Sequence, residues 1–213
     1  MRRRVFRLGL AALLMANALA AEPVAPSVIG LGQPLERAQI ERYAITIFPD
    51  GRNLPPGQGS VAQGATLYQA QCAACHGENG EGRRNGVKGD AKGYLFPALW
   101  GPDSFNNGAG MNRLLTATRF IKHNMPQGVN YKAPLLTDEQ AFDVAAYVLS
   151  QPRPIKAKLE TDFPARWNKP IDAAFPPYVD GASADQHKYG PFPPLAEMAR
   201  KAAEKHAEEM KAK

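Results

Sequence analysis

The spacing of apolar positions predicts three amphipathic helices in the middle of the chain. Apolar side chains recur there every three or four residues, which is the repeat of one face of an α-helix. The first helix begins at Ser60, the second covers roughly Met111–Lys122 and the third begins at Thr137. Their apolar faces comprise Val61, Ala65, Tyr68, Cys72 and Cys75 in the first, Met111, Leu114, Leu115, Thr118 and Ile121 in the second, and Ala141, Val144, Ala145 and Val148 in the third. We therefore expect an all-α core.

The starts of the first and third helices carry a recognisable capping signal. Ser60 is followed three residues later by Gln63, and Thr137 by Gln140, and both pairs predict a capping box. The third helix should end before Pro152, because a proline disfavours helical backbone in the residue before it.

One glycine indicates how two of these helices meet. Gly64 removes a side chain from the first helix, which allows another backbone to approach closely. Tyr68 on the same helix and Tyr147 on the third supply rings that can fill the angle of a crossing. We expect the first and third helices to cross at Gly64.

The N-terminal segment is typical of a secretory signal. Four arginines precede an apolar run over Leu8–Ala21, and Ala18-Leu19-Ala20 provides a cleavage site with small residues. We predict a signal peptide at 1–20 and no membrane anchor in the mature chain, since the apolar run is too short to span a bilayer. An arm at 21–58 should follow, with a short helix near Pro34–Tyr43 and an extended piece at Ala44–Phe48.

Prolines and aromatic residues dominate the segment after the third helix. So many aromatic residues in 153–194 argue against disorder, and we expect an ordered strap that wraps the helical domain at 59–152. The last stretch, 195–213, predicts a charged helix with a thin apolar stripe of Leu195, Met198 and Ala202. A solvated helix is favoured there over one that binds a partner.

A cysteine motif lies at the end of the first helix. Cys72-Ala73-Ala74-Cys75-His76 has the Cys-x-x-Cys-His spacing at which two thiols attach to the vinyl groups of haem. These are the only two cysteines of the chain. A redox dithiol would follow a strand, and a zinc site would need two more ligands at finger spacing, so neither alternative fits. We predict one covalent haem c, with His76 as the proximal iron ligand.

A methionine after the second helix is the candidate for the sixth iron ligand. Met125 lies there in Asn124-Met125-Pro126-Gln127-Gly128, 49 residues past His76. A thioether in that position gives the His/Met ligation of an electron carrier. Met111 is interpreted as core, and His123 stays open as an alternative ligand at a rigid helix end. The order of helix, haem motif, loop, helix, methionine and helix predicts the class I cytochrome c fold.

Two residues of the intervening loop are candidates for contact with the haem group. The carbonyl of Pro97 could accept a hydrogen bond from the free ring nitrogen of His76 and so fix the ring. Trp100 either reaches a haem propionate or only packs, and both interpretations stay open. The segment Gly82–Gly93 holds four basic residues. They could steer an acidic redox partner, but the interpretation as a solvated loop is favoured.

The net charge does not indicate nucleic-acid binding. The chain carries 26 basic and 20 acidic residues, a formal charge of +6, but four of the arginines lie in the predicted signal. The mature chain would be nearly neutral, and we exclude nucleic-acid binding. Neither paired carboxylates nor a nucleophile beside a base stands out, so no catalytic residue is predicted.

Several segments resemble a known family of sulfur-oxidising enzymes. The segments at 93–106, 124–126, 143–147, 150–154 and 187–192 are similar to the second haem domain of dihaem thiosulfate dehydrogenases. Gly30-Leu31-Gly32 and the stretch 48–57 resemble the cytochrome subunits of sulfite and sulfane dehydrogenases. The resemblance implies Cys72 and Cys75 as haem anchors, and His76 and Met125 as axial ligands.

The resemblance also implies a role in periplasmic sulfur oxidation. The dihaem enzymes have another haem domain that handles thiosulfate, and this chain has no second motif. We therefore expect a periplasmic monohaem electron carrier that receives electrons from a sulfur-compound dehydrogenase and passes them to a downstream cytochrome or oxidase. The alternative is a haem enzyme, or catalytic subunit, that oxidises thiosulfate or a related sulfur anion directly.

Overall fold

The computed structural model describes residues 33–38, 48, 53, 57–84, 93–129 and 132–212. The chain divides into two compact units, Met1–Ile40 and Glu41–Lys213. In the first unit only 33–38 are described, and their side chains are exposed. The predicted signal peptide, residues 39–43 of the predicted arm helix and all of the extended piece except Phe48 lie outside the described residues.

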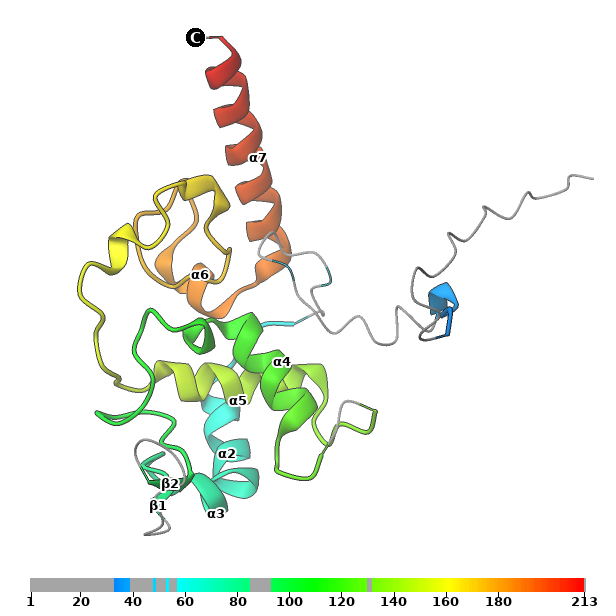
Figure 1. Cartoon of the computed structure of the whole chain (residues 1–213), viewed down its shortest axis with the longest axis vertical. Helices are drawn as coiled ribbons and strands as arrows, with labels where there is room; N and C mark the ends of the chain where they lie inside the picture. Colours follow the sequence, from blue (N-terminus) through cyan, green and yellow to red (C-terminus); the bar gives the residue numbers. More distant parts are fainter. Residues whose placement is uncertain are drawn as a thin grey trace, which may run out of the picture. The chain divides into compact units, whose positions relative to one another are not determined.

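The second unit is mostly helical, as the sequence predicted (Figure 1). Its described helices and strands are α2 (Val61–Gln71), α3 (Ala73–His76), β1 (Arg83–Arg84), β2 (Tyr94–Phe96), α4 (Leu114–Asn124), α5 (Asp138–Ser150), α6 (Ala184–Tyr189) and α7 (Phe192–Lys211). Short 3-10 turns lie at Gly110–Asn112, Leu159–Thr161 and Arg166–Asn168. Within the described part the only sheet is the antiparallel pair β1–β2.

Helices α2 and α5 cross at Gly64, as predicted. A Cβ atom placed on Gly64 would lie 1.9 Å from the backbone oxygen of Asp143 and 2.8 Å from the Cβ atom of Tyr147. Only glycine fits at such a distance. Tyr68 and Tyr147 pack beside the crossing, with their ring centroids 5.4 Å apart.

The two predicted capping boxes have different outcomes. The box at Thr137 and Gln140 is complete at the start of α5. At the start of α2 the hydroxyl of Ser60 accepts the N–H of Gln63, but the N–H of Ser60 donates to Asp143 Oδ1 at 2.8 Å. The prediction of a second complete box was therefore wrong, because a carboxylate from the crossing helix is the stronger acceptor.

The first two predicted helices are shorter than their apolar patterns suggested. Helix α2 ends at Gln71, and Cys72 has φ −121° and ψ −37°, so Cys75 belongs to the separate short helix α3. Met111 lies in a 3-10 turn, and α4 begins only at Leu114. The carboxylate of Asp172 accepts the N–H of Leu115 at 3.0 Å, so a residue 57 positions later caps this helix.

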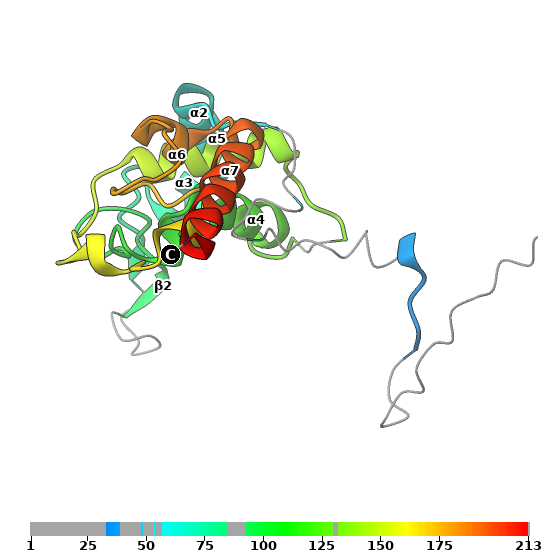
Figure 2. The ribbon, with the colours of Figure 1, turned by 90° about the horizontal axis from the view of Figure 1, so that it is seen from above.

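The strap at 153–194 packs at one end of the helical domain. Ile171 of the strap joins the core cluster formed by residues of α4 and α5, together with Phe192 and Leu195 of α7. Figure 1 shows this end, with α6 and α7, far from α3 and the β1–β2 pair. Figure 2 shows α6 and α7 together over α5.

Helix α7 begins three residues before the predicted start at Leu195. Pro193 and Pro194 occupy its first turn, where backbone N–H groups have no partner within the helix, so prolines are tolerated. Phe192 and Leu195 are buried, whereas most side chains after Arg200 are exposed. The solvated helix that the sequence predicted is therefore anchored through its first turn.

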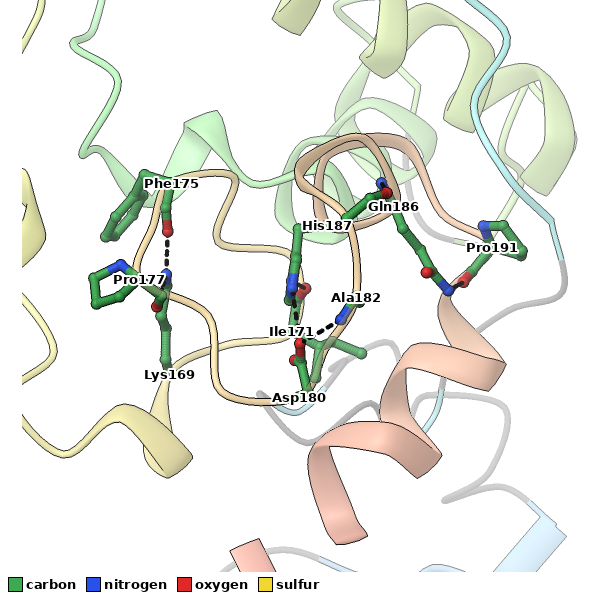
Figure 3. A network of polar contacts seen from close by, with 10 residues as sticks. Lys169, Ile171, Phe175, Pro177, Asp180, Ala182, Gln186, His187 and Pro191 are labelled. Atoms are coloured by element: carbon green, nitrogen blue, oxygen red, sulfur yellow. Dashed lines mark hydrogen bonds and ion pairs between the residues drawn. The ribbon is translucent and has the colours of Figure 1, made fainter. Parts of the chain in front are cut away.

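A buried histidine holds the strap together (Figure 3). His187 is 3% exposed and its Nδ1 atom lies 2.8 Å from the carbonyl oxygen of Ile171. Its Nε2 atom lies 3.2 Å from Asp180 Oδ1, which also accepts the N–H of Ala182. The ring of Tyr178 stacks on the imidazole with centroids 3.8 Å apart. Both ring nitrogens are thus used within the strap.

Lys169 closes the neighbouring turn of the strap. Its ammonium group donates to the carbonyl oxygens of Phe175 and Pro177 and lies 4.4 Å from the ring centroids of Phe175 and Tyr178. Burial, with Arg166 nearby, lowers the pKa of Lys169 to about 8. This lysine acts as a structural link between two turns.

Candidate haem site

The predicted haem-binding residues meet at one cavity of about 580 Å³. Cys72, Cys75, His76, Pro97 and Met125 all line it. The volume lies within the range of small-molecule and cofactor sites, about 300–1,000 Å³. The cavity therefore brings together segments more than 50 residues apart in the sequence.

The rest of the cavity wall is apolar apart from Tyr68, Gln71 and Gln127. It is formed by the loop after the cysteine motif and by helices α4 and α5, through Leu95, Phe96, Ala98, Leu99, Phe105, Met111, Ala117, Phe120, Ile121, Pro126, Val144, Val148 and Leu149. An apolar wall suits the flat, largely hydrophobic ring of a haem group. The chemistry of the donor set and of the wall therefore fits haem c.

The part of the cavity wall that carries His76 is built on the short helix α3. His76 is its last residue, and Gly77 follows with φ +85°, which lets the chain turn away sharply. The His76 Nδ1 atom lies 2.9 Å from the carbonyl oxygen of Pro97, the contact that the sequence predicted. A carbonyl oxygen can only accept, so Nδ1 carries the hydrogen and Nε2 keeps its lone pair for a metal.

Burial affects the cysteine nearer to α2. Burial, and secondarily the neighbouring Cys75, raises the pKa of the Cys72 thiol to about 11. This thiol is therefore protonated at neutral pH.

Tyr68 lies against Cys72, is fully buried, and donates its hydroxyl hydrogen to the carbonyl oxygen of Gly77 at 2.7 Å. Burial raises the pKa of Tyr68, so the phenol stays neutral.

The part of the cavity wall that carries Met125 is built on the end of α4. Met125 follows the last residue of this helix in extended backbone, and its N–H donates to the carbonyl oxygen of Ile121 at 2.9 Å. Phe120 and Ile121 line the cavity beside it. The helix end thus places one thioether at the wall of the cavity that His76 also lines.

Two other predicted candidates lie outside the cavity lining. Trp100 packs against the rings of Tyr68 and Tyr147, with centroids 5.0 Å and 5.7 Å away. His123, the alternative ligand, has a buried Nδ1 atom with no hydrogen-bond partner, and burial lowers the pKa of its ring. Neither residue is part of the described wall, so contact of Trp100 with a haem group stays a prediction.

The basic segment is only partly described. Arg84 forms an ion pair with Asp103 at 2.8 Å and lies over the ring of Tyr94. Lys88 and Lys92 lie outside the described residues. Arg84 is thus partly neutralised by its neighbour.

Several residues of the site were missed by the sequence analysis. Phe105, Met111 and Phe120 line the cavity, although Met111 was assigned to the core only. Arg153 was part of a resembling segment but received no role; its guanidinium lies over the ring of Phe105. No local spacing signal marks these residues, because their role depends on how distant segments pack.

Comparison with known proteins identifies the domain that carries this cavity. A family model described as Cytochrome c matches residues 61–152. Residues 61–152 are a cytochrome c domain. Such a domain implies covalently attached haem c, with Cys72 and Cys75 as the Cys-x-x-Cys pair.

The predicted resemblance to thiosulfate dehydrogenases is confirmed. The chain is 47% identical over 134 residues to a thiosulfate dehydrogenase of Allochromatium vinosum, covering 62% of this chain and 40% of the relative. It is 48% identical over 105 residues to one from Stutzerimonas stutzeri, covering 49% and 32%. The chain therefore spans less than half the length of these relatives.

Two solved structures are also similar to parts of the chain. A thiosulfate dehydrogenase of Marichromatium purpuratum matches with a TM-score of 0.41 and 42% identity, over 49% of this chain and 20% of that chain. The sulfane dehydrogenase SoxCD of Paracoccus pantotrophus matches with a TM-score of 0.42 and 27% identity, over 57% and 58%.

Two absences hold for the described residues. In that part of the chain no helix has the length and apolar character needed to cross a membrane. The same residues contain no group of three or more His, Cys, Asp or Glu side chains that could hold a metal ion.

Proposed function

We propose that the protein is a periplasmic monohaem c-type cytochrome that transfers single electrons in the oxidation of sulfur compounds. The observation that carries this proposal is the placement of His76 and Met125 on the wall of one apolar cavity. Cys72 and Cys75 would anchor the haem group, and His76 and Met125 would hold its iron. Bound haem supplies a one-electron ferric/ferrous couple.

The surroundings of the cavity favour electron transfer over bond-making chemistry. Its wall holds no carboxylate and no lysine or arginine among the described residues. An iron held from both sides leaves no position for a substrate. The chain's own residues then bind the haem group, exclude water and keep the imidazole of His76 oriented through Pro97.

The mouth of the cavity suits contact with a redox partner. Leu95 and Phe120 line the cavity, yet 57% and 41% of their surfaces are exposed. Electron transfer between proteins needs only close approach to the haem edge, so an apolar rim is sufficient. The donor is proposed to be a sulfur-compound dehydrogenase and the acceptor a downstream cytochrome or oxidase.

A second candidate function is direct oxidation of a sulfur anion. The thiosulfate dehydrogenases at 47% and 48% identity favour it, and the chain covers only 40% and 32% of their lengths. This function requires a labile ligand on the Met125 side, where a substrate could reach the iron. It also places the catalytic step on a domain that resembles the second haem domain of those enzymes.

The visible spectrum of the oxidised, haem-loaded protein separates the two functions. Thiosulfate is added first, and a sulfur-compound dehydrogenase with its substrate is added afterwards. Reduction only after the second addition supports the electron carrier. Reduction by thiosulfate alone contradicts it and establishes the enzyme.

A further inference from the structure

Arg153 is a partly buried cation beside the haem cavity that the proposed function does not use. It follows α5 directly after Pro152, and its Nη2 atom donates to the carbonyl oxygen of Val148 at 2.6 Å. Its Nη1 atom is buried and has no hydrogen-bond partner. Burial alone lowers the pKa of the guanidinium to about 10, so the group is still charged at neutral pH.

The neighbours of Arg153 form the cavity wall. The guanidinium carbon lies 4.5 Å from the centre of the Phe105 ring, and Phe105, Val148 and Leu149 all line the cavity. The charge is thus separated from the cavity by a single layer of side chains. This layer contains no polar group that would screen it.

No carboxylate compensates this charge in the described part of the protein. The ion pairs found there join other residues, and Arg153 takes part in none. A partly buried cation without a counter-charge is costly, which makes its position beside a cofactor cavity significant. Because the guanidinium is partly buried, water and salt screen its field on the cavity less than they screen that of an exposed arginine.

We propose that Arg153 raises the reduction potential of the haem by holding an uncompensated positive charge behind the cavity wall. The inference rests on haem c in the cavity, as proposed above. Ferric haem carries one more positive charge than ferrous haem, so a nearby cation destabilises the ferric state more.

The test measures the potential of charge-changing variants of the full haem-loaded chain. Arg153→Gln and Arg153→Met remove the charge with side chains of different shape, and Arg153→Lys keeps it. Arg200→Gln is the matched control, because Arg200 is an exposed cation on α7 paired with Glu197 and Glu204. Haem attachment is verified in each variant by its absorption, so that loss of haem is recognised as failure of the site.

The expected result is a lower potential in both uncharged variants. At a fixed ambient potential the ratio of ferric to ferrous protein should rise about tenfold, which corresponds to a fall of about 59 mV. Arg153→Lys and Arg200→Gln should stay near the original value. An unchanged potential in Arg153→Gln and Arg153→Met overturns the proposal, as does an equal fall in Arg153→Lys at a pH at which the lysine is protonated, which would indicate a packing effect.

The lysine variant alone is decisive if the uncharged variants do not fold. A lysine buried at this position loses its proton at a lower pH than an exposed lysine. The potential of Arg153→Lys should therefore fall as the pH rises through that titration, while the original protein shows no such step. A potential without this step in a variant that has demonstrably lost the proton contradicts the proposal.

Discussion

His76 and Met125 are held at the cavity wall by different hydrogen bonds. His76 ends a four-residue helix and its ring is held by one hydrogen bond to the Pro97 carbonyl oxygen. Met125 is held through its backbone, which closes the last turn of α4. The proximal side chain is therefore fixed at the ring itself, whereas the distal thioether depends on where its helix ends.

Replacing Met125 by alanine should open the distal side of the proposed haem. Haem attachment through the two cysteines should persist, while the reduction potential falls by on the order of 100 mV, within the ~0.8 V range that axial ligands set. The ferric form should then bind imidazole or cyanide rapidly, which absorption spectra can follow. Met210→Ala is the control, since Met210 is exposed on α7. An unchanged potential and spectrum in Met125→Ala would refute the ligand assignment.

The sequence alone was sufficient to predict the site residues that belong to short motifs. Cys72, Cys75 and His76 stand within five positions, and the contact of Pro97 with His76 was expected from the separate loop segment Phe96–Gly101. Phe105 and Arg153 could not be predicted in this way, because they meet only where a loop and the end of α5 pack together. A role that depends on such packing leaves no periodic pattern in the chain.

At the scale of elements, buried aspartates set the starts of two helices. Asp143 of α5 accepts the N–H group of Ser60, the N-cap residue of α2, and Asp172 of the strap accepts an N–H group in the first turn of α4. The apolar patterns predicted the existence of both helices. They could not predict the start of α4 at Leu114, because its capping residue lies in a different segment.

The close crossing of α2 and α5 predicts a large effect of one methyl group. Gly64→Ala should lower the free energy of unfolding by about 1–3 kcal/mol or more, because the added carbon would overlap the backbone of Asp143. Denaturant unfolding measures this change. Gly110→Ala is the control, since the nearest atom to its added carbon is the end of a flexible arginine at 3.8 Å. Equal stability of the two variants would contradict the close crossing.

The buried carboxyl of Asp172 predicts a pH-dependent stability. Burial raises its pKa in the folded state, although the N–H groups of α4 and the nearby Arg113 oppose the shift. The folded chain thus holds this proton to a higher pH than the unfolded chain, whose carboxyl titrates near pH ~3.9. The stability contribution of the group is therefore present below that pH and lost as the pH rises through the folded pKa.

Asp172→Asn removes this titration while keeping an acceptor for the N–H of Leu115. The free energy of unfolding of the original protein should fall relative to that of the variant as the pH rises from about 4 to 7. Asp162→Asn, at a partly exposed ion pair with Lys156, is the comparison. Parallel pH profiles of the original protein and Asp172→Asn would show that the buried carboxyl does not titrate as proposed.

At the scale of the whole described unit, the cavity is separate from the part of the strap that follows Arg153. The residues that line the cavity come from α2, α3, α4, α5 and the loops between them, and the strap contributes none of those described. The strap instead packs with α7 on the far ends of α4 and α5. The sequence predicted an ordered strap from its aromatic residues, but not the end of the domain on which it packs.

This separation predicts that stability and haem properties can be changed independently. Phe192→Ala should lower the free energy of unfolding by about 3–5 kcal/mol, because its ring is buried in the core and stacks on Phe142. The haem spectrum and potential should stay unchanged in the folded variant. Val179→Ala, on the exposed surface of the strap, should change stability by less than about 0.5 kcal/mol. A changed potential in Phe192→Ala would contradict the separation.

The contact between Gly64 and Asp143 has a consequence for how the cytochrome responds to a change in iron charge. One residue of α5 touches α2 with its backbone and also binds the start of α2 with its carboxylate. Neither helix can slide or rotate without breaking both contacts. With haem bound as proposed, we expect the two helices to hold the cysteine motif in place in both valence states of the iron, so that the adjustment falls on the chain around Met125. A frame that hardly rearranges lowers the barrier to passing on an electron.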